Sequence, residues 1–366
     1  MGTSHIRHAE TEADRQAVFR LRYELYVEQQ GLFGDTADHD NRWLSDSRDA
    51  SATLLMAEVE GRLVGTTRIV WGSAGLDAQL RETFEIDRFT DLVSEDEIAV
   101  GSRFLVLPEF RQSKVVFELN VAMVEALIER DAEIMLGECE PHLVNTWTRM
   151  GTRAFGIIEH PTNGMLIRIA FLPGDLERAR SLGSPLAPVM AKRTKQSFAP
   201  RRLAARLSSI QRVVGEAKDG DQFWAQVEQT VAIDRLAQIL GGLEPAEFEA
   251  LLSNSVALDC DPGSWLIREG HVSRTLYILL SGSLEVWDGE RKVVEVTQPG
   301  EIIGEVAFFS RAKRMSDVKI GAEGAQVLAL SDRSLAQLIA TQGSGAAKFM
   351  VAITRGLCHK LHQRAG

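Results

Sequence analysis

The chain has 366 residues, of which 45% are hydrophobic and 25% charged, and its formal net charge is -10. This composition is typical of a globular protein, and the length favours two domains over a single core. No apolar run approaches the ~18 residues that span a bilayer, and the N-terminal segment lacks the apolar centre of a secretory signal.

The three cysteines, Cys139, Cys260 and Cys358, lie far apart in the sequence. Their odd number and spacing argue against a disulfide framework and against a zinc site. We therefore expect a cytoplasmic protein without a bound metal.

The first 180 residues alternate between helical and strand patterns. A helix is predicted over 13–28, where apolar residues recur at helical spacing. Strands over 52–60 and 62–71 flank Glu60-Gly61 and predict a hairpin. The remaining predicted elements are a strand over 97–106, a helix over 114–130, a strand over 133–139, a helix over 143–150 and strands over 157–159 and 166–171. Together they predict a mixed α/β layer domain over 1–180.

A basic segment follows, within a predicted linker over 181–224. Residues 181–215 carry seven basic and no acidic side chains in a stretch rich in Pro, Ser and Ala. A solvated linker is one interpretation, and a docking strip for an acidic partner or an anionic membrane surface is the other. Nucleic acid is not expected, because no recognition motif accompanies the charge.

The C-terminal part, 225–366, changes to short strands separated by turn residues. Two helices are predicted within 236–252, broken at Gly241-Gly242. Strands are predicted over 264–267, 275–280, 283–287 and 292–296, with a further strand pair from Val318 to Leu330. Helices over 333–340 and 346–362 close the chain. This pattern predicts a small barrel or jelly roll with flanking helices.

One stretch of this part has the groups that hold a ribose and a phosphate together. Gly304 allows backbone N–H groups to turn toward an anion. Glu305 can accept a hydrogen bond from a ribose hydroxyl. Arg314 can pair with two phosphate oxygens.

These residues resemble the phosphate cassette of cyclic-nucleotide-binding domains, as in bacterial catabolite activators and cyclic-nucleotide-dependent kinases. The resemblance extends over about 130 residues and includes the turn motifs Pro262-Gly263, Glu269-Gly270, Leu280-Ser281-Gly282 and Pro299-Gly300. It implies a C-terminal β-roll that binds cyclic AMP or cyclic GMP, with the ribose on Glu305 and the phosphate on Arg314. The other implied site residues are Gly304, Val306, Ala307, Met315 and Ser316.

The chain departs from that family at Lys313 and Asp317. Lys313 adds attraction for a phosphate, whereas Asp317 adds repulsion if it faces the site. The transcription factors of that family also need a helix-turn-helix after this domain, and none follows here. We therefore expect the output of the nucleotide site to lie upstream.

The order of elements over 1–180 resembles the Gcn5-related N-acyltransferase fold. In that family a loop at a helix N-terminus binds the pyrophosphate of an acyl thioester donor, which here implies Arg111, Gln112, Ser113 and Lys114. A splayed strand near Leu105, Val106 and Leu107 would direct N–H groups at the thioester carbonyl. Two positions usually held by small residues are Lys114 and Val116.

A closer resemblance is to acyl-homoserine-lactone synthases and long-chain N-acyl amino acid synthases. It rests on 21–31, on 38–40, on Gly65-Thr66-Thr67-Arg68 and on Ser102-Arg103-Phe104. It implies an acyl donor that is acyl-CoA or acyl carrier protein. Lactone synthases have an acidic residue three positions before the matched arginine, where this chain has Val100. That difference favours acylation of another amine.

The residues that bind the acceptor or transfer a proton are not singled out by the spacing of a motif. Arg22, Arg68 and Arg103 are candidates to orient a carboxylate of the acceptor, or to close a structural network with Asp38 and Asp40. Amine attack on a thioester needs a deprotonated amine. The candidate bases are Glu138, His142 and Glu97, with water as the alternative.

The sequence therefore predicts a cyclic-nucleotide-regulated N-acyltransferase that acts on an amine. Two alternatives stay open: a cAMP-gated protein lysine acetyltransferase, and a nucleotide sensor with a non-catalytic acyltransferase scaffold. The expected partners are a small-molecule amine or a lysine side chain, acyl carrier protein as donor, and a second copy of the chain in a homodimer.

Overall fold

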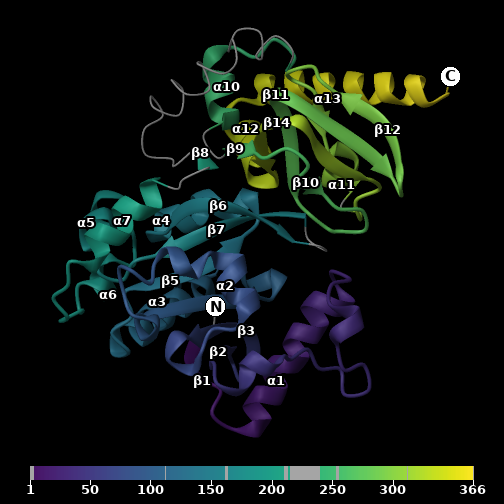
Figure 1. The fold of residues 1–366 in the computed structure, drawn as a ribbon. Helices are drawn as coiled ribbons and strands as arrows, with labels where there is room; N and C mark the ends of the chain where they lie inside the picture. The colour runs from purple at the N-terminus through teal and green to yellow at the C-terminus, as the bar shows by residue number, and fades with distance from the viewer. Residues whose placement is uncertain are drawn as a thin grey trace. The chain divides into compact units, whose positions relative to one another are not determined.

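The fold is that of a computed structural model, shown in Figure 1. The structure describes residues 4–111, 113–160, 164–209, 213–214, 240–252, 255–310 and 312–365. Within the described residues, no helix combines the length and the apolar character needed to cross a membrane.

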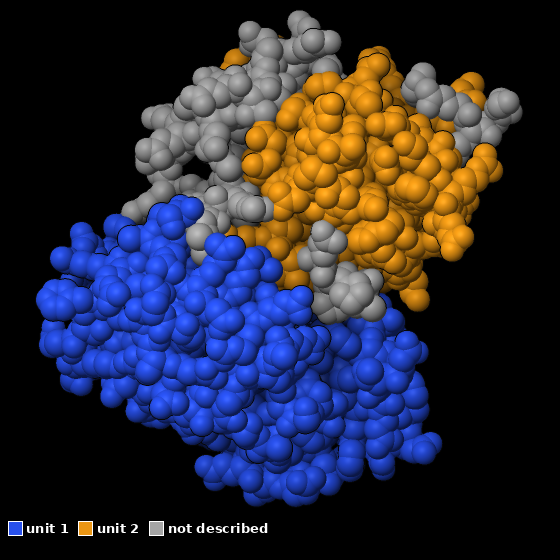
Figure 2. All heavy atoms as spheres, viewed as in Figure 1, with its two compact units in different colours: residues 1–138, 149–153, 168–210 blue, residues 139–148, 154–167, 211–366 orange. Residues whose placement is uncertain are grey.

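Contacts divide the chain into two compact units (Figure 2). Unit 1 comprises Met1–Glu138, Arg149–Arg153 and Arg168–Ile210, and unit 2 comprises Cys139–Thr148, Ala154–Ile167 and Gln211–Gly366. Unit 2 therefore includes the segment that directly follows Glu138 in the chain. The domain bounds 1–180, 181–224 and 225–366 stay a prediction.

The N-terminal half forms a seven-stranded mixed sheet in the order β1-β2-β3-β4-β5-β7-β6. Its first four strands pair antiparallel, and β4 pairs parallel with β5. The predicted mixed α/β fold is thus confirmed, although β1 was not foreseen. The strands are β1 Ser4–His8, β2 Thr53–Val59, β3 Arg62–Trp71, β4 Ile98–Val106, β5 Ile134–Cys139, β6 Arg153–His160 and β7 Gly164–Phe171.

The predicted hairpin is β2 and β3, whose register joins Val59 to Arg62. Both turn residues, Glu60 and Gly61, have positive φ angles of 53° and 77°. A two-residue turn with this geometry matches the right-handed twist of the flanking strands.

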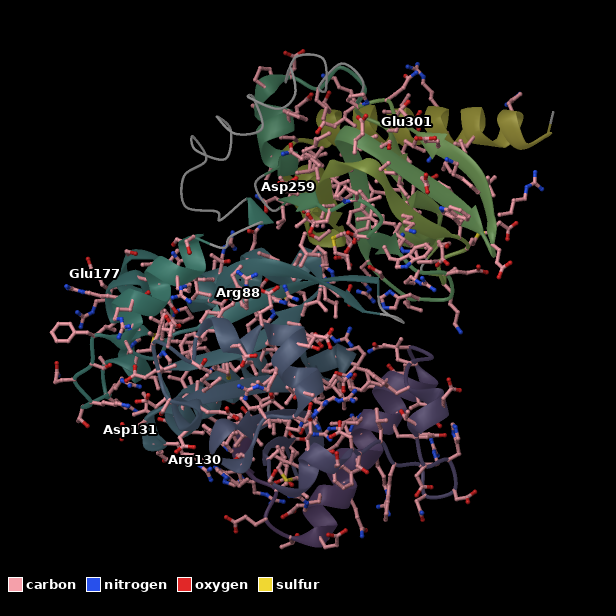
Figure 3. All side chains as sticks on the ribbon, in the orientation of Figure 1. Arg88, Arg130, Asp131, Glu177, Asp259 and Glu301 are labelled. Atoms are coloured by element: carbon pink, nitrogen blue, oxygen red, sulfur yellow. The ribbon has the colours of Figure 1, made fainter. Side chains whose placement is uncertain are left out.

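Helix α3 covers this sheet with its apolar face. Its buried Val115, Leu119 and Met123 belong to one core cluster with Leu55 and Ile69 of β2 and β3. Exposed charged side chains, among them Arg130, Asp131 and Glu177, lie on the surface (Figure 3). The helices of this half are α1 Glu12–Arg22, α2 Ala78–Phe84, α3 Lys114–Glu129, α4 Val144–Met150, α5 Leu176–Ser181, α6 Ala187–Met190 and α7 Ala199–Ser209.

The basic segment is folded over its described part. Helix α7 buries Leu203 and Leu207. Basic side chains of the segment pair with carboxylates of the same unit: Lys192 with Glu125 at 2.8 Å, Arg193 with Glu133 at 2.9 Å and Arg206 with Asp91 at 2.8 Å. These three basic side chains are therefore largely neutralised within unit 1.

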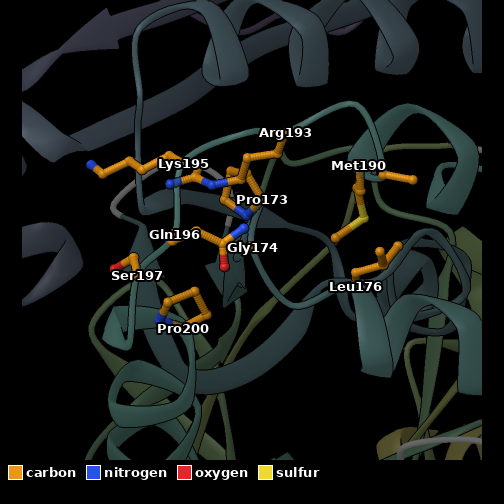
Figure 4. A pocket seen from close by; sticks show the side chains of 10 residues that line it. Pro173, Gly174, Leu176, Met190, Arg193, Lys195, Gln196, Ser197 and Pro200 are labelled. Carbon is orange, nitrogen blue, oxygen red and sulfur yellow. The ribbon is translucent and has the colours of Figure 1, made fainter.

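A cavity of about 250 Å³ lies in this region, lined among others by Pro173, Met190, Arg193 and Lys195 (Figure 4).

The C-terminal half is an antiparallel β-roll, as predicted, with a main strand order of β12-β11-β14-β9-β8. Its core joins the strands to the helices through residues such as Ile278, Leu328, Leu338 and Phe349. The strands are β8 Val213–Val214, β9 Val256–Cys260, β10 Trp265–Ile267, β11 Thr275–Asp288, β12 Arg291–Val296, β13 Ile302–Ile303 and β14 Asp317–Ser331. The helices are α10 Pro245–Leu252, α11 Glu305–Ser310, α12 Asp332–Thr341 and α13 Gly343–Ala365.

Two predictions for this half are wrong. The strand pair expected from Val318 to Leu330 is the single strand β14. Ser281-Gly282 does not end a strand but lies within the continuous strand β11, where the register to β14 shifts. Gly282 has a φ of 81°, and a Cβ there would lie 2.1 Å from the carbonyl oxygen of Gly324. A glycine at such a bulge lets two backbones approach closely and bends the strand without ending it.

Candidate functional site

Strands β4 and β5 separate after a short paired stretch. Their parallel register runs only from Ile98–Ile134 to Val100–Leu136, whereas β4 continues to Val106. The register between β3 and β4 shifts beside Arg103, whose φ is 55°. A non-glycine residue in this region is strained, and such bulges re-aim side chains near functional sites. The C-terminal end of β4 is therefore no longer paired with β5.

Of the three residues predicted to polarise the carbonyl, Val106 has the suitable N–H group. The N–H of Leu107 donates to the carbonyl of Val64 at 2.8 Å, so it is already used. Because hydrogen-bonded pairs alternate along antiparallel strands, Leu105 also faces β3 and Val106 faces away from it. The carbonyl of Val106 accepts a hydrogen bond from Nε of Arg111 at 3.1 Å.

The start of α3 follows directly. The hydroxyl of Ser113 caps the helix, accepting from the Val115 N–H at 3.2 Å and donating to the Phe110 carbonyl at 2.7 Å. Lys114 is exposed at the first helical position. Gln112 lies outside the described residues. A capped N-terminus with an exposed cation is suited to an anionic donor group.

The three predicted acceptor arginines lie in one network, but not with the predicted partners. Arg22 pairs with Asp49 at 2.8 Å, and Arg68 pairs with Asp46 at 2.6 Å and with Asp49 at 3.1 Å. Arg103 reaches Asp46 at 3.5 Å. The sequence analysis predicted Asp38 and Asp40 as the partners. Nothing in the local sequence pattern distinguishes Asp46 and Asp49 from the other acidic residues of this segment.

Burial separates the roles of these arginines. The side chains of Arg22 and Arg68 are 1% and 3% exposed, so they are held inside the structure. The Arg103 side chain is 16% exposed and lies over the Phe33 ring at 4.2 Å. Of the three, Arg103 is the best placed to meet an acceptor.

The three candidate bases have different surroundings. Glu138 is solvent-accessible at the separating end of β5, and desolvation by nearby protein raises its pKa while Arg103 opposes the shift. Glu97 pairs with Lys195 at 2.7 Å. Desolvation acts to raise the pKa of Glu97, but hydrogen bonds from Lys195 and Ser94 outweigh it, so the pKa is lowered.

The third candidate base, His142, belongs to unit 2. Its Nδ1 lies 3.2 Å from the Glu140 carboxylate and 3.5 Å from the Thr275 hydroxyl. A general base works best with a pKa near the working pH. Of the two carboxylates, Glu138 with its raised pKa suits this role better than Glu97, whose pKa is lowered by Lys195 and Ser94.

The nucleotide cassette has a buried arginine at its centre. Arg314 is 4% exposed and donates to the Gly304 carbonyl at 2.7 Å and to the Thr275 carbonyl. Its Nε is buried without a hydrogen-bond partner, and within the described part of the chain no carboxylate pairs with it. Desolvation lowers its pKa. A buried guanidinium without a paired anion is costly, and a bound phosphate would compensate it.

Glu305 has an ion-pair partner that the sequence did not reveal. Its carboxylate is 3.1 Å from Nζ of Lys360 on α13, which also donates to the Ile302 carbonyl. The two residues are 55 positions apart in the chain, so no local signal could join them.

The remaining cassette residues divide by exposure. Ala307 is buried, Ser316 is half-buried, and Val306 and Met315 are exposed. Asp317 accepts from the Glu269 N–H at 2.6 Å and pairs with Arg268 at 3.4 Å. Its charge is thus engaged away from Arg314, which removes the repulsion that its position in the sequence raised.

Comparisons with known proteins find similarity over parts of this chain. The acetyltransferase Pat of Mycolicibacterium smegmatis is 32% identical over 99 residues, 26% of this chain and 29% of that protein. A CRP-like cAMP-activated global transcriptional regulator of Mycobacterium tuberculosis is 29% identical over 84 residues, 22% of this chain and 38% of the regulator. The chain thus spans well under half the length of either relative.

A solved structure of a CoA-dependent acyl-homoserine lactone synthase, MesI, has 23% sequence identity and a TM-score of 0.39. The match covers 50% of this chain and 95% of that one. Family models match two separate regions: the N-acyl amino acid synthase FeeM model over residues 17–162, and the cyclic nucleotide-binding domain model over residues 258–342. The N-terminal half is therefore similar to N-acyl amino acid synthases, and the C-terminal half to cyclic nucleotide-binding domains.

Proposed function

We propose that the chain transfers an acyl group from a thioester, acyl-CoA or acyl carrier protein, to the amine of a small molecule, and that a cyclic nucleotide regulates the transfer. The observation that carries the regulatory part is the buried, anion-free guanidinium of Arg314 beside Gly304 and Glu305. The FeeM match over 17–162 and the separated end of β4 support the catalytic part.

The chemistry uses few side chains. The acceptor nitrogen attacks the thioester carbonyl, a C–N bond forms, and the C–S bond breaks. The attacking nitrogen loses a proton to Glu138, directly or through water, and that proton passes on to the leaving thiolate. The Val106 N–H is directed where it can stabilise the charge that develops on the carbonyl oxygen.

An acceptor that carries a carboxylate fits the exposed arginine best. Arg103 is the least buried of the three arginines, and its charge acts to lower the pKa of Glu138. An arginine fork pairs with a carboxylate through two hydrogen bonds. An amino acid presents an amine and a carboxylate together, which favours this class of acceptor.

A protein lysine acetyltransferase is the second candidate. The similarity to the acetyltransferase Pat favours it, although the chain spans only 29% of that protein. The two candidates differ in their products, because one acylates a free amine and the other a lysine side chain.

Mass spectrometry of cells that express the full chain separates these functions. A new N-acylated amine in the lipid extract, absent with Glu138→Gln, supports the first. New acetyl-lysine marks without that lipid support the second. Absence of both products, together with a thermal shift by cyclic AMP, would leave a nucleotide sensor with a non-catalytic scaffold.

A further inference from the structure

The last helix of the chain reaches the nucleotide cassette through one side chain. Helix α13 packs into the core of unit 2 through Phe349 and Ile353. Two turns beyond Ile353, Lys360 extends to the Glu305 carboxylate at 3.1 Å and to the Ile302 carbonyl. One ammonium group therefore holds both the carboxylate and the strand β13 that precedes it.

We propose that Lys360 is a further residue of the nucleotide site, which positions Glu305 for the ribose of a cyclic nucleotide. The proposal rests on the nucleotide binding proposed above. The Glu305 side chain is 8% exposed, and a buried carboxylate is stabilised by a paired cation. Lys360 is the cation that pairs with it among the described residues.

The Glu305 carboxylate keeps an oxygen that no hydrogen bond of the described residues reaches. A carboxylate has two oxygens, each able to accept hydrogen bonds, and Lys360 pairs with only Oε1. The second oxygen stays available for the 2′-hydroxyl of a ribose. Because Lys360 also donates to the Ile302 carbonyl, the ammonium group that holds Oε1 is itself held at β13.

The charges point the same way. A cyclic nucleotide brings one negative charge at its phosphate, and Glu305 contributes a second negative charge. Arg314 alone balances one of these two. Lys360 balances the other.

The chain offers a matched control on the same helix. Lys348 of α13 pairs with Glu247 at 2.8 Å, and its side chain is 31% exposed, the same as that of Lys360. Its carboxylate partner is also 8% exposed. Lys348→Met therefore removes an equivalent ion pair of α13 away from the cassette.

The test is calorimetric titration of the full chain with cyclic AMP and 2′-deoxy cyclic AMP. Lys360→Met should weaken cyclic AMP binding at least about tenfold, the effect of losing one hydrogen bond to a charged group. Lys360→Arg should retain most of the affinity, and Lys348→Met should leave it unchanged. With the 2′-deoxy nucleotide, the loss caused by Lys360→Met should be smaller, because Glu305 then has no hydroxyl to bind and only the charge effect remains.

Other outcomes overturn the proposal in distinguishable ways. If Lys360→Met binds cyclic AMP as well as or more tightly than the unsubstituted chain, Lys360 is structural or competes with the ligand, while nucleotide binding itself stands. If Lys360→Met loses the same affinity for cyclic AMP and for 2′-deoxy cyclic AMP, Lys360 does not act through the ribose contact of Glu305. If the unsubstituted chain binds neither cyclic AMP nor cyclic GMP, the proposed regulation fails together with this inference.

Discussion

The guanidinium of Arg314 donates a hydrogen bond to the backbone carbonyl of Thr275, the first residue of β11. The hydroxyl of the same threonine lies 3.5 Å from Nδ1 of His142. His142 follows Glu138, the preferred base, by four positions in the chain. A phosphate that draws Arg314 away from Thr275 therefore perturbs a residue in contact with the turn after β5.

Thr275→Val should weaken the effect of cyclic nucleotide on the transfer rate. Valine has nearly the same shape and keeps the backbone carbonyl that binds Arg314, but it loses the hydroxyl that meets His142. Substitutions along such a connection change coupling by about 0.5–2 kcal/mol. The measurement is the transfer rate with and without saturating nucleotide.

Thr275→Ser is the matched control, since it keeps the hydroxyl and should keep the regulation. Nucleotide affinity should change little in either variant. A Thr275→Val protein with full regulation would show that the signal does not pass through this hydroxyl.

Arg314→Lys should abolish most nucleotide binding although it preserves the charge. A lysine ammonium cannot form the two parallel hydrogen bonds of a guanidinium fork. Loss of a buried, hydrogen-bonded charge partner costs about 2–5 kcal/mol, or about 30-fold to several thousand-fold in Kd. Calorimetric titration with cyclic AMP measures this loss.

Lys292→Gln serves as the comparison for that variant. Lys292 of β12 pairs with Glu285 at 3.2 Å and with Glu295 at 3.1 Å, so it is a cation of the same unit that pairs with no cassette residue. Its affinity for the nucleotide should be unchanged. Equal losses in both variants would indicate a general effect of positive charge.

Glu138→Gln should lower kcat by about 10²–10⁴-fold, the usual contribution of a general base. Because the pKa of Glu138 is raised, the unsubstituted enzyme should lose kcat/KM as the pH falls through a value above the ordinary glutamate pKa. That acidic limb should be absent from the profile of the variant. Glu125→Gln, which removes only a surface partner of Lys192, should match the unsubstituted enzyme. Loss of activity in Glu97→Gln instead would contradict the assignment.

Asp49→Asn should destabilise the N-terminal half strongly. The Asp49 side chain is 3% exposed and pairs with two buried arginines, Arg22 and Arg68. Removing one partner of a buried ion pair costs about 3–5 kcal/mol, because the remaining charge is left uncompensated. Denaturant unfolding measures this loss, and a change below about 1 kcal/mol would mean that solvent reaches the network.

The pH dependence of stability should report on Asp46. Desolvation acts to raise its pKa, but the hydrogen bond and charge of Arg68 outweigh it, so the pKa lies below its usual value. A lowered native pKa contributes stability that is present above the unfolded pKa of about 3.9 and is lost as the pH falls through the native pKa. Asp46→Asn should therefore remove part of the acid-induced loss of stability below about pH 4. An unchanged unfolding profile in acid would exclude this contribution.

Much of this organisation follows from the sequence by itself. Turn residues such as Glu60-Gly61, helical spacing over α3, and the Gly304-Glu305 cassette with Arg314 depend on neighbours within a few residues. Local patterns of this kind determine which elements form and which ligand class they suit.

Only the tertiary structure decided which side chains meet. It joined Arg22 and Arg68 to Asp49 rather than to Asp38 or Asp40, left Val106 with the outward N–H, and brought Lys360 to Glu305 across 55 positions. These partners depend on the packing of elements that are distant in the sequence. A buried charge is stabilised by an opposite charge close to it in space, and the spacing of residues along the chain does not show which charges become neighbours.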